Sequence, residues 1–324
     1  MKVCIYGAGA IGGLFAARLA HHADVSLVAR GATLASLQEH GLRLQTGTTI
    51  DHVRVTVTDE PATLGPQDLV ILAVKGQALP DIADRLAPLL GPDTAILSAM
   101  NGVPWWFFEG FGGALAGTRL SSVDPDGRMA RSIDARRLIG SVIHLTCSTR
   151  EPGLVHHGFG QGLILGEPSG HVSERLQGLA ELFRRAGFEV SLSDSIQKDI
   201  WYKLWGNMTM NPVSALTGAT CDRILDEPLT REFCLKVMAE AAQIGAAIGC
   251  PIAQSGEDRM NVTRKLGAFK TSMLQDAEAG RALEVETLVG AVREIGQKLG
   301  IATPWTDALL GLTRLKNASL TRTD

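Results

Sequence analysis

The sequence lacks several features on which whole classes of protein depend. Its 31 Lys and Arg residues are outnumbered by 34 Asp and Glu residues, so no basic surplus is present to bind nucleic acid. No apolar run approaches the roughly 20 residues that cross a bilayer, and Leu69–Val74 has only the length of a buried strand. The N-terminus reaches glycine too early for the apolar stretch of a secretory signal. We therefore expect a protein without membrane spans that works in the cytoplasm.

Cysteine and histidine show no arrangement suited to disulfides or metal. The chain has five cysteines, an odd number, with no CxxC pair, so we expect reduced thiols. The neighbouring pairs His21-His22 and His156-His157 point apart on a helix or a strand. We therefore expect no metal site.

The first part of the chain, residues 1–192, alternates short apolar runs with amphipathic stretches, which is typical of strand–helix–strand units. Leu42–Val57 resembles a hairpin, His171–Ala186 a helix, and Trp105–Arg137 is irregular. The predicted strands are Lys2–Tyr6, Val25–Val28, Leu69–Val74, Ala95–Ala99, Leu138–Thr146, Leu163–Gly166 and Glu189–Leu192. This pattern predicts an α/β domain, a Rossmann-type doubly wound sheet.

The second part, residues 193–324, shows helical periodicity and no convincing strand. The predicted helices are Ile196–Met210, Arg231–Ile248, Asp258–Asp276 and Glu284–Gly300. Proline is expected to end helices, and we place Pro212, Pro228, Pro251 and Pro304 between them. The sequence thus predicts a C-terminal all-helical domain beginning near residue 193.

A glycine-rich turn directly follows the first predicted strand. Gly7-Ala8-Gly9-Ala10-Ile11-Gly12 has the GxGxxG spacing of a dinucleotide site, and a helix and a second strand follow it. Gly7 permits a tight turn, Gly9 lets a pyrophosphate approach the backbone, and Gly12 lets the helix pack on the strand. The helix N-terminus then faces the phosphates, so the turn predicts a dinucleotide cofactor.

Arg30 indicates which dinucleotide binds. NAD sites usually have an acidic residue at the end of the second strand, where it holds the ribose hydroxyls. This chain has Val28-Ala29-Arg30 there and no carboxylate. A guanidinium can bond a 2′-phosphate bidentately, which favours NADP; the alternative is a solvated loop cation.

A polar stripe marks the first helix of the second domain. Lys203, Asn207 and Asn211 stand at i, i+4 and i+8, so they lie along one face. A cation and two amides make a poor core and a good wall for a polar ligand, although a solvated helix face is the alternative. Trp201 and Trp205 are expected to pack beside the stripe as core residues.

Taken together, these segments resemble the ketopantoate reductase (2-dehydropantoate 2-reductase) family over nearly the whole chain. The resemblance rests on their order and spacing. The segments are the GxGxxG turn with Arg30, Val74-Lys75, Asn101-Gly102, Trp201 to Asn207 with Asn211-Pro212, Ser272 to Asp276, and Gly280-Arg281 with Glu284.

The resemblance implies a role for each polar residue. Lys203 would be the general acid that protonates the carbonyl oxygen as hydride reaches the carbon. Asn207, Asn211 and Ser272 would hold the substrate, a small 2-oxo acid. Lys75 and Asn101 would lie beside the nicotinamide, and Glu284 would contact the sugar end of the cofactor. Taken alone, Lys75 or Glu284 would more often be a surface charge, and only the whole set of residues favours a site. Gly280 is expected to break the helix between Ser272 and Glu284.

Three departures from the family pattern concern the substrate. Cys221 and Phe269 stand where the family tends to have asparagine, and Trp105–Arg137 is long and aromatic. Some of its four consecutive aromatic residues must be buried, either against the helical domain or a second subunit, or near the substrate.

We therefore expect an NADPH-dependent oxidoreductase that reduces 2-dehydropantoate to (R)-pantoate, with the active site between two domains. The alternatives are a reductase for another 2-oxo acid, equivalent to a D-2-hydroxyacid dehydrogenase of the same family, and a non-catalytic NADP sensor. A homodimer is possible, because apolar helical domains often form dimer interfaces.

Overall fold

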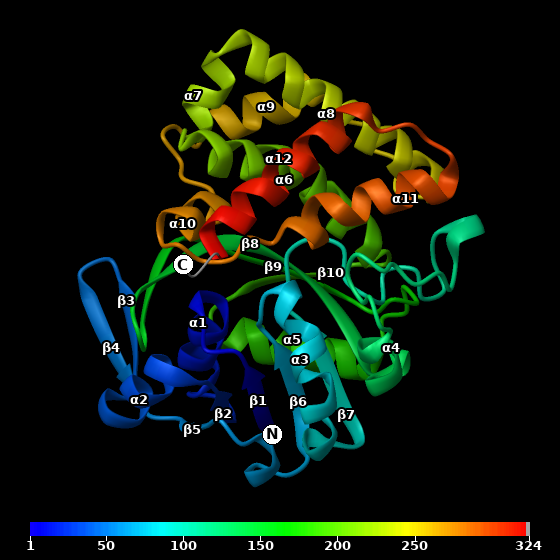
Figure 1. The fold of residues 1–324 in the computed structure, drawn as a ribbon. Coiled ribbons are helices and arrows are strands. Elements are labelled where there is room, and N and C mark those ends of the chain that lie inside the picture. Colours follow the sequence, from blue (N-terminus) through cyan, green and yellow to red (C-terminus); the bar gives the residue numbers. More distant parts are fainter. Residues whose placement is uncertain (322–324) are drawn as a thin grey trace. The chain divides into compact units, whose positions relative to one another are not determined.

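Ten strands form one sheet in the computed structural model, which describes residues 1–321 (Figure 1). The chain packs as two units. The sheet unit comprises residues 1–100 and 126–196, and the helical unit comprises residues 101–125 and those from Gln197 on. The segment 101–125 thus packs with the helices. The predicted domain division after residue 192 stays a prediction.

The sheet order is β4-β3-β9-β8-β7-β6-β1-β2-β5, and β10 also pairs with β9. Pairing is antiparallel between β3 and β4 and between β8 and β9, and parallel elsewhere. The sheet is therefore mixed, with a Rossmann-type parallel part. The strands are β1 (Lys2–Tyr6), β2 (Asp24–Val28), β3 (Leu42–Thr46), β4 (Thr49–Val53), β5 (Thr56–Thr58), β6 (Gln67–Leu72), β7 (Leu90–Ser98), β8 (Leu138–Glu151), β9 (Leu154–Gly166) and β10 (Glu189–Leu192).

Strand order reverses beside β1, because the chain moves from β1 to β2 on one side and from β6 to β7 on the other. Right-handed crossovers therefore place their helices on opposite faces of the sheet. The helices of this unit are α1 (Ala10–Leu19), α2 (Gly31–His40), α3 (Leu79–Ile82), α4 (Arg128–Ser132) and α5 (Glu174–Arg185). The carboxyl edge beside β1 and β6 is the point at which ligands bind in such sheets.

An aromatic cluster joins α1 to α5 in the core of the sheet unit. The ring of Phe15 lies 5.3 Å from those of Phe183 and Phe188, both edge-on. All three side chains are buried, and each contributes about 1.5–3 kcal/mol of burial free energy. The cluster therefore fixes α1, whose N-terminus carries the glycine turn.

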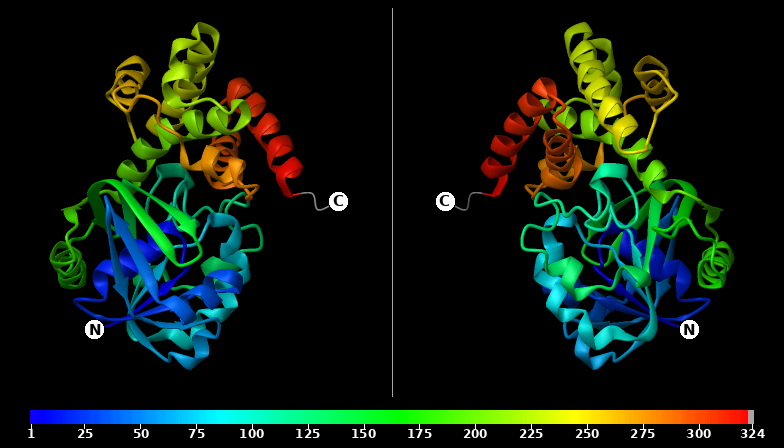
Figure 2. Two further views of the ribbon diagram at one scale, coloured as in Figure 1. Left: turned by 90° about the vertical axis from the view of Figure 1, so that its left-hand side faces the viewer. Right: turned by 90° about the vertical axis from the view of Figure 1, so that its right-hand side faces the viewer.

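The helical unit is built from seven α-helices and one π-helical turn within its described residues (Figure 2). Buried Glu240 on α8 caps α12, because its carboxylate accepts hydrogen bonds from the Trp305 and Thr306 amides at 2.9 and 2.8 Å. The elements are α6 (Ile196–Thr217), α7 (Cys221–Asp226), α8 (Pro228–Ala247), α9 (Gly256–Arg264), α10 (Ser272–Glu278), the π-turn η7 (Glu286–Gly290), α11 (Ala291–Leu299) and α12 (Pro304–Thr321).

Two helix predictions were wrong. Pro212 lies inside α6, which continues to Thr217. Proline removes one helical hydrogen bond, but the helix continues because Val213 and Ala215 beyond it are buried. The predicted helix Asp258–Asp276 is two helices, α9 and α10, separated by Gly267 at φ +65° and by Thr271, which caps α10. Helices α7 and α12 were not predicted.

None of the helices within residues 1–321 combines the length and the apolar character needed to cross a membrane.

Candidate active site

The glycine turn has the shape of a phosphate cradle. A Cβ on Gly7 would lie 2.7 Å from the Ala73 oxygen, and one on Gly12 would lie 1.9 Å from the Gly7 oxygen, so neither position has room for a side chain. A Cβ on Gly9 would meet nothing within 4 Å. Gly9 is exposed and directly precedes α1, whose first amides have no helical acceptor. The turn is therefore closed by its two outer glycines and open at Gly9, which fits a pyrophosphate.

Lys75 and Arg30 both follow strands that neighbour β1. The turn at Gly7 packs on Ala73 and Val74, and the half-buried Lys75 comes next. Gly7 N–H donates to the Val28 oxygen at 3.0 Å, and the exposed Arg30 follows two residues later at the start of α2. The structure thus places the strand ends that precede both residues against the glycine turn.

The pKa of Tyr6, at the end of β1, is influenced by the charge of Arg30. Burial raises the pKa of this tyrosine, while the positive charges of Arg85 and Arg30 oppose the rise. Arg30 is therefore close enough to the end of β1 to act electrostatically there.

Lys203 lies on α6 in the helical unit, where it bonds an amide oxygen and is influenced by a carboxylate. Its Nζ donates a hydrogen bond to Asn101 Oδ1 at 3.0 Å. Burial lowers the pKa of Lys203 from 10.5 to about 8, and the negative charge of Glu284 opposes that shift. Desolvation disfavours the ammonium and a nearby carboxylate favours it. The result is a lysine that can both hold and release a proton near neutral pH, as a general acid must.

Asn207 and Asn211 continue from Lys203 along α6, because this helix spans all three residues. Lys203 and Asn207 are half-buried and Asn211 is buried. The flanking Trp201 and Trp205 are 1% and 2% exposed, which confirms that they are core residues. The Trp205 indole donates to the Met238 oxygen at 2.8 Å and so holds α6 against α8.

Ser272 is the first residue of α10 and is exposed. Helix α10 ends at Glu278, and Gly280 follows at φ +63° with the Arg281 amide donating to the Asp276 oxygen at 2.8 Å. This is a glycine-terminated Schellman ending. It confirms that Gly280 breaks the helix before Glu284. A place for Ser272 beside the stripe stays a prediction.

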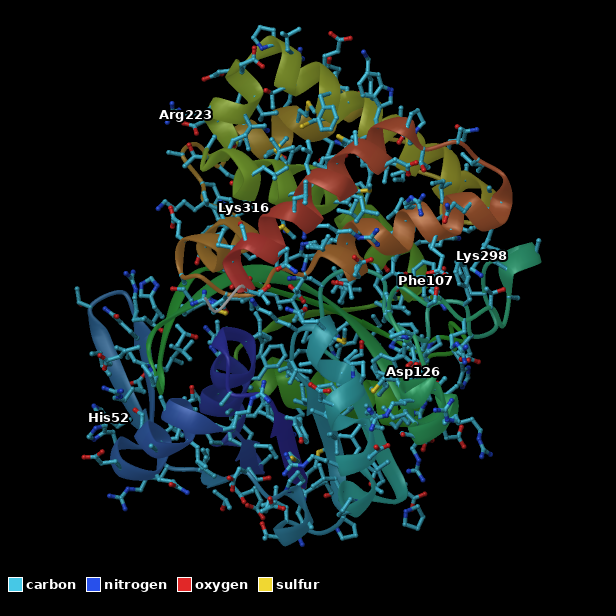
Figure 3. The ribbon with its side chains drawn as sticks, in the orientation of Figure 1. His52, Phe107, Asp126, Arg223, Lys298 and Lys316 are labelled. Atoms are coloured by element: carbon cyan, nitrogen blue, oxygen red, sulfur yellow. The ribbon has the colours of Figure 1, made fainter. Side chains whose placement is uncertain are left out.

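The aromatic segment after Asn101 is part of the core of the helical unit. Trp105, Trp106, Phe107 and Phe108 are all at most 6% exposed, which confirms their predicted burial. Phe107, labelled in Figure 3, has its ring 6.0 Å from that of Trp201 on α6. These aromatic residues pack against the helices of their own chain.

A carboxylate holds the C-terminal end of the segment 101–125. Glu294 on α11 accepts hydrogen bonds from the Ser121 and Ser122 amides at 2.9 and 2.8 Å. Burial alone would raise the pKa of Glu294, but the hydrogen bonds from Ser122 and Ser121 hold it below its usual range. The segment 101–125 is therefore attached to the helices at both ends.

Cys221 and Phe269 are linked to each other through the main chain. The Cys221 amide donates to the Phe269 oxygen at 3.0 Å. Cys221 is 2% exposed, and burial raises the pKa of its thiol to about 11. Cys221 is therefore a neutral packing group at neutral pH.

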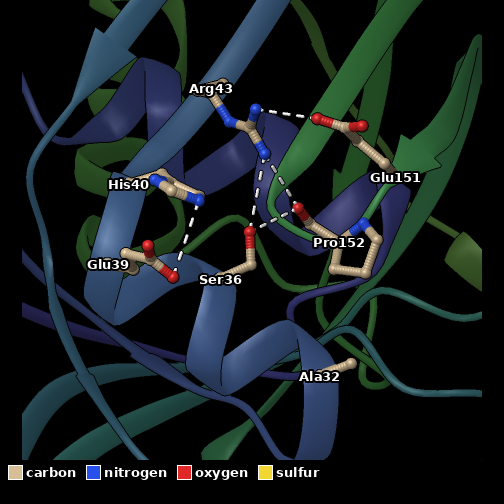
Figure 4. Close-up of a pocket in the computed structure, with 7 residues that line it drawn as sticks. All are labelled: Ala32, Ser36, Glu39, His40, Arg43, Glu151 and Pro152. Carbon is tan, nitrogen blue, oxygen red and sulfur yellow. Dashed lines mark hydrogen bonds and ion pairs between the residues drawn. The ribbon is translucent and has the colours of Figure 1, made fainter.

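One surface hollow of about 310 Å³ lies on the sheet unit, and none of the predicted site residues lines it (Figure 4). Arg43 is its main charge, and it pairs with Glu151 at 2.8 Å and bonds the Pro152 oxygen at 3.0 Å. Because this charge is already neutralised, the hollow adds nothing to the candidate site. The lining residues are Ala32, Ser36, Glu39, His40, Arg43, Glu151 and Pro152.

Sequence reasoning missed the contacts that hold Asn101. Gly102 has φ +83°, and the Val103 amide donates to the Thr287 oxygen at 2.9 Å. The Asn101-Gly102 dipeptide was a local signal for a turn, but no pattern indicated that Thr287 would meet it.

Comparisons with known proteins agree with this architecture. The family model described as ketopantoate reductase PanE/ApbA matches residues 3–108, and that of its C-terminal region matches residues 195–317. The chain is 44% identical to the 2-dehydropantoate 2-reductase of Mesorhizobium japonicum, over 97% of each chain.

Solved structures show the same fold. A candidate ketopantoate reductase from Ralstonia solanacearum MolK2 superimposes with a TM-score of 0.94 at 56% identity, over 98% of both chains. A D-mandelate dehydrogenase shares the fold at 21% identity, with a TM-score of 0.85 over 99% of this chain and 100% of the other. Because both family models and a full-length relative match it, the chain belongs to the ketopantoate reductase family.

Proposed function

We propose that this protein catalyses the NADPH-dependent reduction of 2-dehydropantoate to (R)-pantoate, with Lys203 as the proton donor. The observation that carries the proposal is the state of Lys203. It is a desolvated lysine with a pKa of about 8, hydrogen-bonded to an amide and influenced by a carboxylate. Family membership supplies the substrate, because the full-length relative is named for this reaction.

The phosphate groups of the cofactor would bind the sheet unit. Gly7, Ala8 and Gly9, with the first amides of α1 at Ala10, Ile11 and Gly12, would hold the pyrophosphate, and Arg30 would pair the 2′-phosphate. Lys75 and Asn101 would lie beside the nicotinamide and Glu284 beside the cofactor sugar. NADPH supplies the hydride that reaches the carbonyl carbon of the substrate.

Lys203 would act where negative charge develops. As the carbonyl carbon gains hydride, its oxygen becomes an alkoxide, and the Lys203 ammonium donates a proton to that oxygen. The alcohol product then carries the proton, and Lys203 is left neutral until solvent protonates it again. Asn207, Asn211 and Ser272 would bind the hydroxyl and carboxylate groups of the substrate.

The test is a steady-state comparison of 2-oxo acids with NADPH, followed by absorbance at 340 nm. We expect the highest kcat/KM with 2-dehydropantoate. A preference for phenylglyoxylate or 2-oxoisovalerate would instead assign a different 2-oxo acid reductase. We expect a lower kcat/KM with phenylglyoxylate, because the rings of Trp105 to Phe108 are buried within the helical unit.

Lys203→Ala tests the assigned chemistry. We expect kcat to fall by about 100-fold or more while the Kd for NADPH is unchanged, since general acid catalysis commonly supplies that factor. Near-normal turnover at saturating substrate would remove Lys203 from the mechanism. NADPH binding without turnover in the wild type, on every 2-oxo acid tried, would favour a sensor.

We further propose a cytoplasmic homodimer. A dimeric ketopantoate reductase from Staphylococcus aureus shares the fold, and the five cysteines of this chain are all free. Light scattering during size-exclusion chromatography would give the mass of the assembly, and a monomer would contradict this part of the proposal.

A further inference from the structure

The hydrogen bond from Lys203 to Asn101 depends on the position of the backbone that follows Asn101. Gly102 adopts φ +83°, and a Cβ on it would lie 2.4 Å from the Thr287 oxygen and 2.6 Å from the Thr287 carbonyl carbon. The neighbouring atoms are main chain, so they have little freedom to move. The next residue, Val103, is fully buried and donates its N–H to the same Thr287 oxygen at 2.9 Å.

The π-helical turn makes the Thr287 oxygen available. In an α-helix the Ala291 amide would donate to Thr287, four residues earlier. Here it donates to Glu286, five residues earlier, as expected for the π-turn η7. The Thr287 oxygen instead receives the Val103 amide. Single π-turns of this kind often occur at functional sites.

The same stretch of chain carries Glu284, whose charge influences Lys203. Glu284 lies three residues before Thr287, and its carboxylate is the charge that acts on the lysine. Residues 284–290 therefore carry a charge that acts on Lys203, and their Thr287 main chain contacts residues 102 and 103, which follow Asn101.

Resting on the function proposed above, we infer that the Thr287 main chain is a positioning element for the proton donor, acting through Gly102 and Val103 on Asn101. Asn101 Oδ1 accepts from the ammonium and so stabilises the protonated form of Lys203. If residues 101–103 are displaced, the ammonium loses an acceptor. Lys203 then releases its proton at lower pH and is less well oriented towards the substrate.

Gly102→Ala tests this inference in the full-length protein. The added methyl cannot fit against the Thr287 carbonyl, so residues 101–103 must shift. We expect kcat to fall about 10-fold or more, and the basic limb of the kcat/KM profile to move to lower pH by about one pH unit, the scale of one hydrogen bond to a charged group. The Kd for NADPH is measured alongside.

The matched control is Gly300→Ala, which places the same methyl at a similar φ of +69° in the same unit. A Cβ there meets nothing within 4 Å. This control carries the strain of a side chain at positive φ without the collision. We expect its kcat within about twofold of the wild type and an unchanged pH profile.

A second variant covers the case in which Gly102→Ala does not fold. Replacing Val103 by its α-hydroxy acid turns the amide into an ester, which removes the donor to Thr287 and keeps the side chain. We expect the basic limb to move in the same direction by a smaller amount. Circular dichroism and thermal melting establish that each variant is folded.

The ionisation of Lys203 can also be measured without turnover. The rate at which acetic anhydride labels Lys203, followed by mass spectrometry across pH, gives its pKa directly. If folded Gly102→Ala and the ester both leave this pKa and the basic limb at their wild-type positions, the inference is wrong. If the wild type reduces no 2-oxo acid but the labelling pKa still moves in the variants, the proposed function fails and the positioning role stands.

Discussion

The pKa of Lys203 makes a quantitative prediction about rate and pH. With a pKa of about 8, about nine-tenths of the lysine is protonated at pH 7 and about one-tenth at pH 9. If the ammonium donates the proton, kcat/KM for reduction should therefore fall about 10-fold between these values. An ordinary lysine, with a pKa near 10.5, would lose only a few per cent over the same range.

The direction of the pH effect follows from which protonation state of Lys203 is active. The protonated lysine is the active form in reduction, so activity is full below the pKa and is lost as pH rises through it. Oxidation of pantoate needs the neutral lysine, so the reverse rate should rise across the same range. The assay is NADPH oxidation at 340 nm at subsaturating 2-dehydropantoate, because kcat/KM reports the groups of the free enzyme.

Two variants separate Lys203 from other titrating groups. Lys203→Arg carries a guanidinium that does not lose its proton in this range, so its residual activity should be flat between pH 7 and 9. Glu284→Gln removes the charge that raises the lysine pKa, so its basic limb should move to lower pH. A wild-type profile that stays within twofold from pH 7 to 9 would refute the reasoning.

Three further substitutions test separate parts of the structure. Arg30→Ala should raise the KM for NADPH by about 10- to 100-fold with little change for NADH, because a charge-assisted hydrogen bond is lost; equal losses would disprove the 2′-phosphate assignment. Trp106→Ala should lower the unfolding free energy by about 3–5 kcal/mol, since Trp106 is 1% exposed. The Kd for NADPH should stay within about threefold of the wild type. A large loss of NADPH affinity in a folded variant would instead place the segment Trp105–Arg137 in the cofactor site. Glu240→Ala should cost about 2–4 kcal/mol in urea unfolding, because three donors at α12 lose their acceptor. Glu232→Ala, which breaks an exposed ion pair with Lys236, is its control and should cost less than about 1 kcal/mol.

Local patterns in the sequence predicted much of the sheet unit, although β9 begins at Leu154 and not at Leu163, and β8 continues to Glu151 and not only to Thr146. Strands β1 and β10 begin and end at the predicted residues, and β2 differs by one residue. Each is a short run of apolar residues or of alternating polar and apolar residues, bounded by polar residues, glycine or a turn, so its limits are set by neighbouring residues in the chain. The hairpin of β3 and β4 was visible for the same reason.

The helical unit was less predictable, because tertiary packing overrides local signals there. Pro212 normally ends a helix, but the buried residues beyond it continue α6. The π-turn η7 depends on the Val103 amide, nearly two hundred residues away in the chain, and no periodicity encodes that contact. The stripe on α6 was predictable because it needs only helical spacing, whereas the Asn101 bond and the Glu284 charge on Lys203 required the folded chain.

The two groups seen to act on Lys203, Asn101 and Glu284, belong to the helical unit. Asn101 and Glu284 pack with α6, and the same unit supplies Thr287, which holds Asn101 in place. The glycine turn and Arg30 belong to the sheet unit. The contacts named for Lys203 and those that shape the glycine turn therefore lie in different units. Arg30→Ala should accordingly change cofactor affinity without moving the basic limb, and Glu284→Gln should move that limb even where NADPH binding is saturated.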